Sequence, residues 1–147
     1  MALMDKEQIK KIIPHRDPFL LIDEVLELEP GVRCVAQKYI APDSFWFEGH
    51  YPGYPVTPGV LMVEMLAQTA AVCGMSVKGN EGKIPLFAGV NKARFRRQVL
   101  PGETLRLEVE IAQARASIGV GKGTATVDGK RAVTCEMTFA YSEANDQ

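Results

Sequence analysis

The sequence lacks several features that would assign it to a specialised class of protein. Its three cysteines, Cys34, Cys73 and Cys135, are scattered and form no Cys-x-x-Cys pair. This pattern argues against a disulfide framework and a zinc site, and it favours reduced thiols in a cytoplasmic protein. No apolar run approaches the length of a membrane span, and residues 1–11 lack the apolar core of a signal peptide.

An excess of charge of either sign is also missing. The 147 residues carry a formal net charge of −1, so the total charge gives no reason to expect a nucleic-acid partner. Apolar residues make up 46% of the chain and charged residues 24%, which is the composition of an ordinary globular protein. Without repeats or a convincing linker, residues 1–147 are expected to form a single domain.

The hydrophobic pattern predicts one long helix among several strands. Residues 60–77 are apolar around the whole circumference of a helix, which indicates a buried helix. A short helix is expected at 6–13, with Asp5 as its N-cap, and Asp128-Gly129 is typical of a hairpin turn. Strands are expected at 19–31, which ends in a Glu-Pro-Gly turn, and at 32–40, 104–111, 117–127 and 130–141. In 104–111 and 130–141 apolar residues alternate along the strand and are expected to share one face. One buried helix and an antiparallel sheet long enough to wrap around it define an α+β domain.

Glu64 is a charged residue inside this otherwise apolar helix. A buried carboxylate is costly unless it has a partner or a raised pKa. Gln68 lies one helical turn later on the same face, so the two side chains are expected to form a polar strip. An exposed position, or a structural pairing with an arginine, would explain Glu64 equally well.

His50 is one of only two histidines and follows Gly49 in a loop. Loops carry a large share of functional side chains, although a lone histidine is more often structural. Three prolines at 52, 55 and 58 have the spacing of a polyproline helix and would stiffen the segment after His50. A rigid support of this kind suits a general base, since that chemistry requires a fixed side chain.

Two backbone and charge features complete the list of candidates. Pro58-Gly59 opens the long helix, and the first N–H groups of a helix are free to donate to a polarised carbonyl. The stretch 91–99 gathers four cations, which are either a solvated strand face or a docking surface for an acidic partner. If this stretch is extended, Lys92, Arg94 and Arg96 point to the same side.

The chain contains the motifs PHRDPFLLIDEV, GHYPGYPVTPGVLMVEMLAQ and FAGVNKARFRRQVLPGE, and a closing VDGK stretch. In order and spacing, these motifs resemble the FabZ-type β-hydroxyacyl-acyl-carrier-protein dehydratases of bacterial type II fatty-acid synthesis. The similarity covers about residues 9–141, and its central motif is specific. The resemblance implies the hot-dog fold, in which a long antiparallel sheet wraps around one central helix. It also implies a homodimer, commonly assembled as a hexamer of three dimers.

The resemblance further implies a catalytic pair, formed by His50 of one subunit and Glu64 of its neighbour beside an acyl tunnel. The N–H groups of Gly59 and Val60 would stabilise an enolate-like oxygen, with no metal or cofactor. The tunnel and its support would include Tyr51, Pro58, Gln68, Phe87, Ala88 and Gly89. The acidic acyl carrier protein would dock on Lys92, Arg94, Arg96 and Arg97, and its phosphopantetheine arm would deliver the substrate.

Other hypotheses remain open at the level of sequence. A hot-dog thioesterase would hydrolyse the same class of thioester, and a non-catalytic acyl-binding module would bind without turnover. Glutamate at position 64, where the related FabA type has aspartate, favours a dehydratase without isomerase activity. The sequence does not decide the preferred acyl length, the choice between dimer and hexamer, or which side chain handles each proton.

Overall fold

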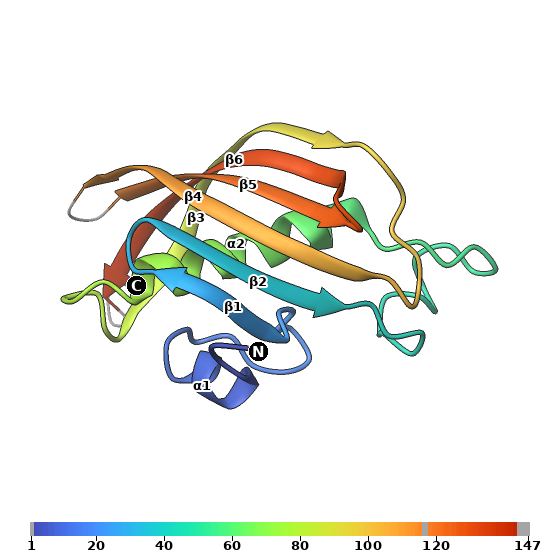
Figure 1. Cartoon of the computed structure of the whole chain (residues 1–147), viewed down its shortest axis with the longest axis horizontal. Coiled ribbons are helices and arrows are strands. Elements are labelled where there is room, and N and C mark those ends of the chain that lie inside the picture. Colours follow the sequence, from blue (N-terminus) through green and yellow to red (C-terminus); the bar gives the residue numbers. More distant parts are fainter. Residues whose placement is uncertain (1, 116–117, 144–147) are drawn as a thin grey trace.

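The structure, a computed structural model, describes residues 2–115 and 118–143 as a six-stranded antiparallel sheet curved around one long helix (Figure 1). The strand order is β1-β2-β4-β5-β6-β3. The elements are α1 (Lys6–Lys10), β1 (Glu24–Glu29), β2 (Arg33–Tyr39), α2 (Gly59–Met75), β3 (Lys83–Phe95), β4 (Thr104–Arg115), β5 (Ile118–Val127) and β6 (Lys130–Glu143). The predicted α+β class, with a sheet wrapped around one central helix, is confirmed.

The central helix α2 is buried on nearly every side, as its pattern predicts. From Met62 to Met75 every residue except Glu64 is buried. The helix ends where the N–H and hydroxyl of Ser76 both donate to the carbonyl of Val72. Its bounds therefore differ from the expected range 60–77 by only one or two residues.

The strands of the second half also follow their predicted alternation. In β4, Leu105, Leu107 and Val109 are fully buried against the helix. Between β5 and β6, Asp128 and Gly129 have φ values of 50° and 79°. Two consecutive left-handed residues define the tight hairpin turn that this dipeptide favours, so the predicted turn is confirmed. The first residue of the expected strand 117–127 lies outside the described residues.

The expected strand over 19–31 is wrong in its first half, because β1 begins only at Glu24. Leu20, Leu21 and Ile22 are consecutive and all buried, which a strand with one covered face cannot achieve. The N–H of Leu21 donates to the side chain of Gln68 and not to a neighbouring strand. Residues 20–22 are therefore buried in a loop that the side chain of Gln68 holds in place.

Helix α1 begins as predicted and ends earlier. The side chain of Asp5 accepts the N–H of Gln8, and the side chain of Gln8 accepts the N–H of Asp5, which forms a capping box. The helix stops at Lys10, and the guanidinium of Arg16 donates to the carbonyl oxygens of Lys10 and Ile13 beyond this point. The helix expected over 6–13 therefore loses its last three residues.

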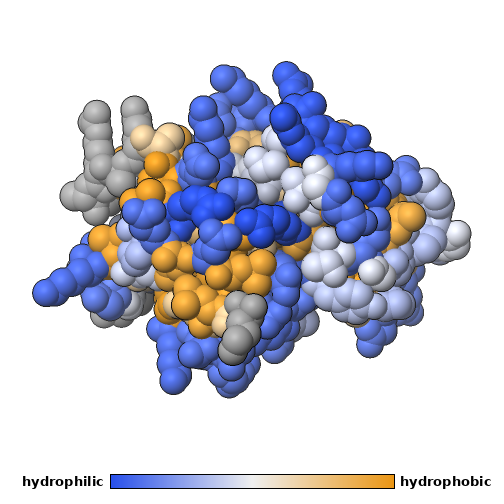
Figure 2. Space-filling view, viewed as in Figure 1, coloured by the Kyte–Doolittle hydropathy of each residue, from blue (hydrophilic) through white to orange (hydrophobic). Residues whose placement is uncertain are grey.

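Strand β3 forms one edge of the sheet, and among the described residues it pairs with β6 alone. The hydrophobic pattern does not predict this strand, because Pro85 and Gly89 interrupt the alternation of its residues. It exposes four apolar side chains by 42–54%: Leu86, Phe87, Val90 and Phe95. The face seen in Figure 2 is mostly hydrophilic, with a hydrophobic area below and to the left of its centre. In the part of the chain that the structure describes, no helix is long and apolar enough to cross a membrane.

Candidate active site

Glu64 lies on the side of α2 that faces β3 and β6, with a side chain that is 18% exposed. Burial raises the pKa of its carboxyl group, and a hydrogen bond from Gln68 opposes this shift. The amide nitrogen of Gln68 donates this bond to Oε2 over 3.0 Å, so the polar strip expected from the spacing is present. A partly desolvated carboxyl group of this kind holds its proton more tightly than an exposed one.

Gln68 joins this carboxyl group to the preceding loop. Its side chain is fully buried, its Oε1 accepts the N–H of Leu21 over 2.8 Å, and its Nε2 donates to the carbonyl of Phe19 over 2.8 Å. These two bonds to the main chain fix which end of the amide is the donor. The NH₂ group is thereby directed at Glu64, which can only accept when it is ionised.

His15 is a neighbour of Glu64 that the sequence did not predict. Its Nε2 lies 3.8 Å from Oε2 of Glu64, which is too long for a hydrogen bond. Burial, assisted by the charge of Arg16, lowers the pKa of His15. The lowered pKa of His15 and the raised pKa of Glu64 both favour the uncharged forms. The contact is therefore better described as a neutral imidazole beside a carboxyl group than as an ion pair. Its only signal in the sequence is that this loop holds the second histidine.

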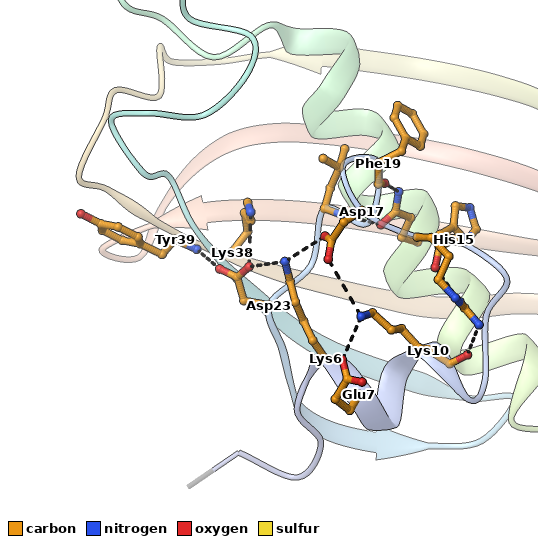
Figure 3. A network of polar contacts seen from close by, with 12 residues as sticks. Lys6, Glu7, Lys10, His15, Asp17, Phe19, Asp23, Lys38 and Tyr39 are labelled. Carbon is orange, nitrogen blue, oxygen red and sulfur yellow. Dashed lines mark hydrogen bonds and ion pairs between the residues drawn. The ribbon is translucent and has the colours of Figure 1, made fainter.

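The loop that carries His15 is held by polar contacts on both sides (Figure 3). Asp17 lies 3.4 Å from Lys6 and 4.0 Å from Lys10, so α1 contacts the loop from outside. Arg16 also donates to the carbonyl of His15 itself. With Gln68 on the inner side, the loop is attached both to α1 and to α2.

His50 is held in a defined orientation in the long loop between β2 and α2. Its Nδ1 lies 2.8 Å from the carbonyl oxygen of Val56, which can only accept, so Nδ1 carries the hydrogen. In the neutral ring Nε2 then has a free lone pair, as a general base requires. The ring stacks on Tyr51 with centroids 3.9 Å apart. No hydrogen bond or ion pair joins His50 to Glu64 among the described residues of one chain.

The loop after His50 is not the polyproline helix that its prolines suggest. The N–H of Tyr54 donates to the carbonyl of Tyr51 over 2.8 Å, and Gly53 has a φ of 84°. Pro52 and Gly53 therefore form the centre of a tight turn, with glycine where the left-handed conformation is needed. Stiffness here comes from this turn and from the bond of His50 to Val56.

The start of α2 has free donors, as predicted. Pro58 is the N-cap and supplies no side-chain bond, and among the described residues the N–H groups of Gly59 and Val60 have no acceptor. Packing also favours glycine at position 59, because a Cβ atom there would lie 2.6 Å from the ring of Phe95. A pocket of about 460 Å³ opens at this point, and its lining includes Val60, Phe95 and Arg97.

The predicted basic residues divide between two surfaces. Lys92, Arg94 and Arg96 line one groove of about 410 Å³ on the outer face of the sheet, joined by Lys122. A bulge in β3, where Lys92 has a φ of 52°, lies in this stretch. Arg97 does not line the groove; it lines the pocket at the start of α2 and lies 2.8 Å from Glu103. Arg96 lines both.

Three of the expected tunnel residues, Phe87, Ala88 and Gly89, lie on β3 and differ in their surroundings. Phe87 lines a small cavity of about 40 Å³ beside Glu64 and stacks on Phe139 with centroids 5.3 Å apart. Ala88 is exposed, and neither Ala88 nor Gly89 contributes to the three cavities described above. They lie on the edge of the sheet that β3 forms, where the described residues place no further strand beside it.

Solved structures with the same arrangement define the class of fold. The dehydratase heterocomplex ApeI:P from Xenorhabdus doucetiae superposes with a TM-score of 0.81 over 92% of this chain and 91% of that one, at 16% identity. A hypothetical thioesterase with coenzyme A from Streptococcus pneumoniae gives a TM-score of 0.65 at 12% identity, over 82% and 85% of the two chains. At such identities the likeness shows the hot-dog fold alone.

Sequence comparison is more specific. A family model described as a FabA-like domain matches residues 13–136, and the chain belongs to this family. The 3-hydroxyacyl-[acyl-carrier-protein] dehydratase FabZ of Staphylococcus epidermidis is 54% identical over 97% of this chain and 99% of that protein. Its counterpart in Staphylococcus aureus strain JH9 is 55% identical over 97% of each.

Proposed function

We propose that this chain removes water from 3-hydroxyacyl chains carried as thioesters on acyl carrier protein, giving trans-2-enoyl thioesters. The observation that carries the proposal is the identity of 54–55% over 97% of the chain to proteins named as 3-hydroxyacyl-[acyl-carrier-protein] dehydratases. The local geometry of His50, Glu64 and the start of α2 supports the same reaction.

His50 is the proposed base. Dehydration begins with loss of a proton from C2, next to the thioester carbonyl, and Nε2 of His50 is the nitrogen with a free lone pair. The carbonyl of Val56 accepts from Nδ1–H and so also stabilises the imidazolium that forms. This is the role that a fixed hydrogen-bond partner has for a general base.

The start of α2 is the proposed site of the thioester oxygen. As the C2 proton leaves, negative charge develops on that oxygen, and the free N–H groups of Gly59 and Val60 can donate to it. Phe95 covers Gly59 and is 54% exposed, so its ring must turn aside before a substrate can approach.

Glu64 is the proposed acid. The C3–O bond breaks with its electron pair on oxygen, the C2–C3 double bond forms, and the carboxyl proton of Glu64 completes the departing water. Burial raises the pKa of Glu64, which favours the protonated form that this step needs. After Glu64 has given up its proton, the NH₂ group of Gln68 donates a hydrogen bond to the resulting carboxylate and stabilises it.

The complete site is proposed to lie between two subunits, with His50 of one chain facing Glu64 of its neighbour. Two features support a shared site. Among the described residues of one chain, no hydrogen bond or ion pair joins the two side chains, and β3 is an edge strand with exposed apolar residues. We propose a homodimer with two such sites, assembled further into a hexamer of three dimers, in the cytoplasm.

The proposed docking surface for acyl carrier protein consists of Lys92, Arg94, Arg96 and Arg97. An acidic partner would be attracted to the groove that three of these residues line. Arg96 and Arg97 also line the pocket at the start of α2, so the pantetheine arm would enter beside the docking surface.

The proposed function is tested by assaying the purified protein for the dehydration and for the reverse hydration reaction. With 3-hydroxyacyl thioesters on acyl carrier protein, the absorbance of the conjugated enoyl thioester should rise, and a thiol-trapping reagent should detect no released thiol. His50→Ala should lose at least about 100-fold in kcat/KM, the typical contribution of a positioned base. Tyr54→Phe, an exposed change in the same loop, serves as the matched control. Release of free thiol would instead support a thioesterase, and binding without turnover an acyl-binding module.

A further inference from the structure

A narrow apolar space continues beyond Glu64 toward the C-terminal end of α2, and the proposed chemistry does not use it. The cavity of about 40 Å³ beside Glu64 is bounded on the helix by Ala67 and Ala71, roughly one and two turns further on. On the sheet side it is bounded by residues of β3 and β6: Pro85, Phe87 and Phe139. Alanine at both helical positions leaves this side of the cavity open.

Tyr141 does not line this cavity but lies over Gly74, about one helical turn beyond Ala71. It follows Phe139 on the same face of β6, and it is paired with Pro85 across the two strands. Its hydroxyl lies so close to Gly74 that a Cβ atom there would overlap it. The same oxygen would be 3.1 Å from a Cβ atom at Gly119, in β5. The ring therefore lies across the gap between α2 and the sheet, and two glycines make the room for it.

The order of contacts along α2 is consistent with a single passage. Phe95, at the end of β3, packs on Gly59, at the start of the helix, whereas Pro85 and Phe87 are further along beside Glu64 and Ala71. Strand and helix thus run in opposite directions, from the open pocket to Tyr141. From Gly59 to Gly74 the helix advances about 22 Å.

We infer that Tyr141 sets the maximum length of the acyl chain that this enzyme accepts, by closing the far end of the passage over Gly74. The inference rests on the proposed function, in which the thioester is bound at Gly59 and the reacting carbons lie beside Glu64. The acyl chain then extends along Ala67 and Ala71, and its methyl end meets the ring of Tyr141.

Phe87 and Tyr141 differ in how far their rings can move when a substrate enters. The cavity holds little more than one small group, so a longer chain requires a wall to move. Phe87 is 43% exposed and can turn away from Phe139. Tyr141 lies between Gly74 and Gly119, where its ring meets the main chain of a helix and a strand. Phe87 is therefore the movable wall, and Tyr141 is the fixed end.

The experiment measures kcat/KM for a series of 3-hydroxyacyl thioesters of increasing length on acyl carrier protein. For Tyr141→Ala, chains beyond the wild-type limit should gain at least about tenfold, since one methylene group in an apolar pocket changes discrimination by that amount. The shortest chains should be unaffected. Ala71→Val adds methyl groups to the cavity and should move the limit toward shorter chains.

Tyr141→Phe is the matched variant: it keeps the ring and removes only the hydroxyl that lies against Gly74, so it should move the limit much less than Tyr141→Ala. If Tyr141→Ala proves unstable in thermal unfolding, Tyr141→Leu and Ala71→Val decide the question. An unchanged length profile in the folded variants would overturn the inference while leaving the dehydratase proposal intact. Failure of the wild type on every chain length would count against the proposed function itself.

Discussion

At the scale of single residues, the main feature is a carboxyl group placed where its charge is unfavourable. Glu64 is surrounded by apolar residues, with His15 and Gln68 as its polar neighbours. Sites that carry chemistry are commonly less stable than an inert replacement would be, because the reactive group is held against its preferred state. Activity and stability should therefore move in opposite directions when Glu64 is changed.

Replacing Glu64 by glutamine tests this trade-off. We expect at least about a 100-fold loss of kcat/KM, because the acid is gone, and a gain of about 1 kcal/mol in the free energy of unfolding at pH 7. Burial raises the pKa of Glu64 above its unfolded value, so between the two pKa values the native state binds more protons than the unfolded state. Stability from this group is then present at low pH and lost as pH rises.

The advantage of Glu64→Gln should consequently grow as the pH rises from below about 4.3, the ordinary pKa of glutamate, toward neutrality. Urea unfolding at a series of pH values measures the difference. A difference that stayed constant with pH would show that the charge of Glu64 is not the cause.

At the scale of elements, one side chain connects the buried loop before β1 to the central helix. Gln68 accepts the buried N–H of Leu21 and donates to the part-buried carbonyl of Phe19. Those main-chain groups would otherwise be paired in a strand. The loop containing His15 is only a few residues away, so this connection also helps to keep His15 beside Glu64.

Gln68→Met should destabilise the protein by about 2 to 3 kcal/mol, because it keeps the volume but leaves the buried N–H of Leu21 and the part-buried carbonyl of Phe19 without partners. Denaturant unfolding measures the loss, and the Leu21 amide should exchange its hydrogen faster. Ser76→Ala is the control: its hydroxyl bonds only to Val72 within the same helix, so the change should cost less than about 1 kcal/mol. If both variants lost the same free energy of unfolding, the connection between loop and helix would stabilise the protein no more than an ordinary hydrogen bond within the helix does.

At the scale of the whole molecule, the proposed site requires two chains. If inactive His50→Ala and Glu64→Gln chains are refolded together, about half of the dimers should contain both, and each of these has one intact site of two. The mixture should therefore recover about a quarter of the wild-type activity. Mixed dimers that form and remain inactive would exclude a site shared between subunits.

The role of the basic groove in docking can be tested separately from catalysis in the same assembly. Arg94→Glu should raise KM for substrates on acyl carrier protein by about tenfold or more and weaken the dependence of kcat/KM on salt, because rim charges act mainly on association. With a small pantetheine thioester, kcat/KM should stay as in the wild type. Lys83→Glu, on the same strand but outside the groove, is the control. An equal effect on both substrates would place the defect in the active site.

Local patterns of the sequence were sufficient for much of this protein. The apolar circumference of α2, the alternation of β4 and β6 and the Asp128-Gly129 turn each depend on neighbours within a few residues, and all three are confirmed. The pairing of Gln68 with Glu64 follows from helical spacing in the same way.

What only the tertiary structure decided depends on segments far apart in the chain. Gln68 bonds to residues 47 and 49 positions earlier, which turns an expected strand into a loop. His15 meets Glu64, and Tyr141 covers Gly74, through contacts that no local period encodes. Periodicity reports which face of an element is covered, whereas the identity of the covering residue is set by packing across the core. The sequence by itself therefore determined the elements, and the tertiary structure decided which side chains surround Glu64.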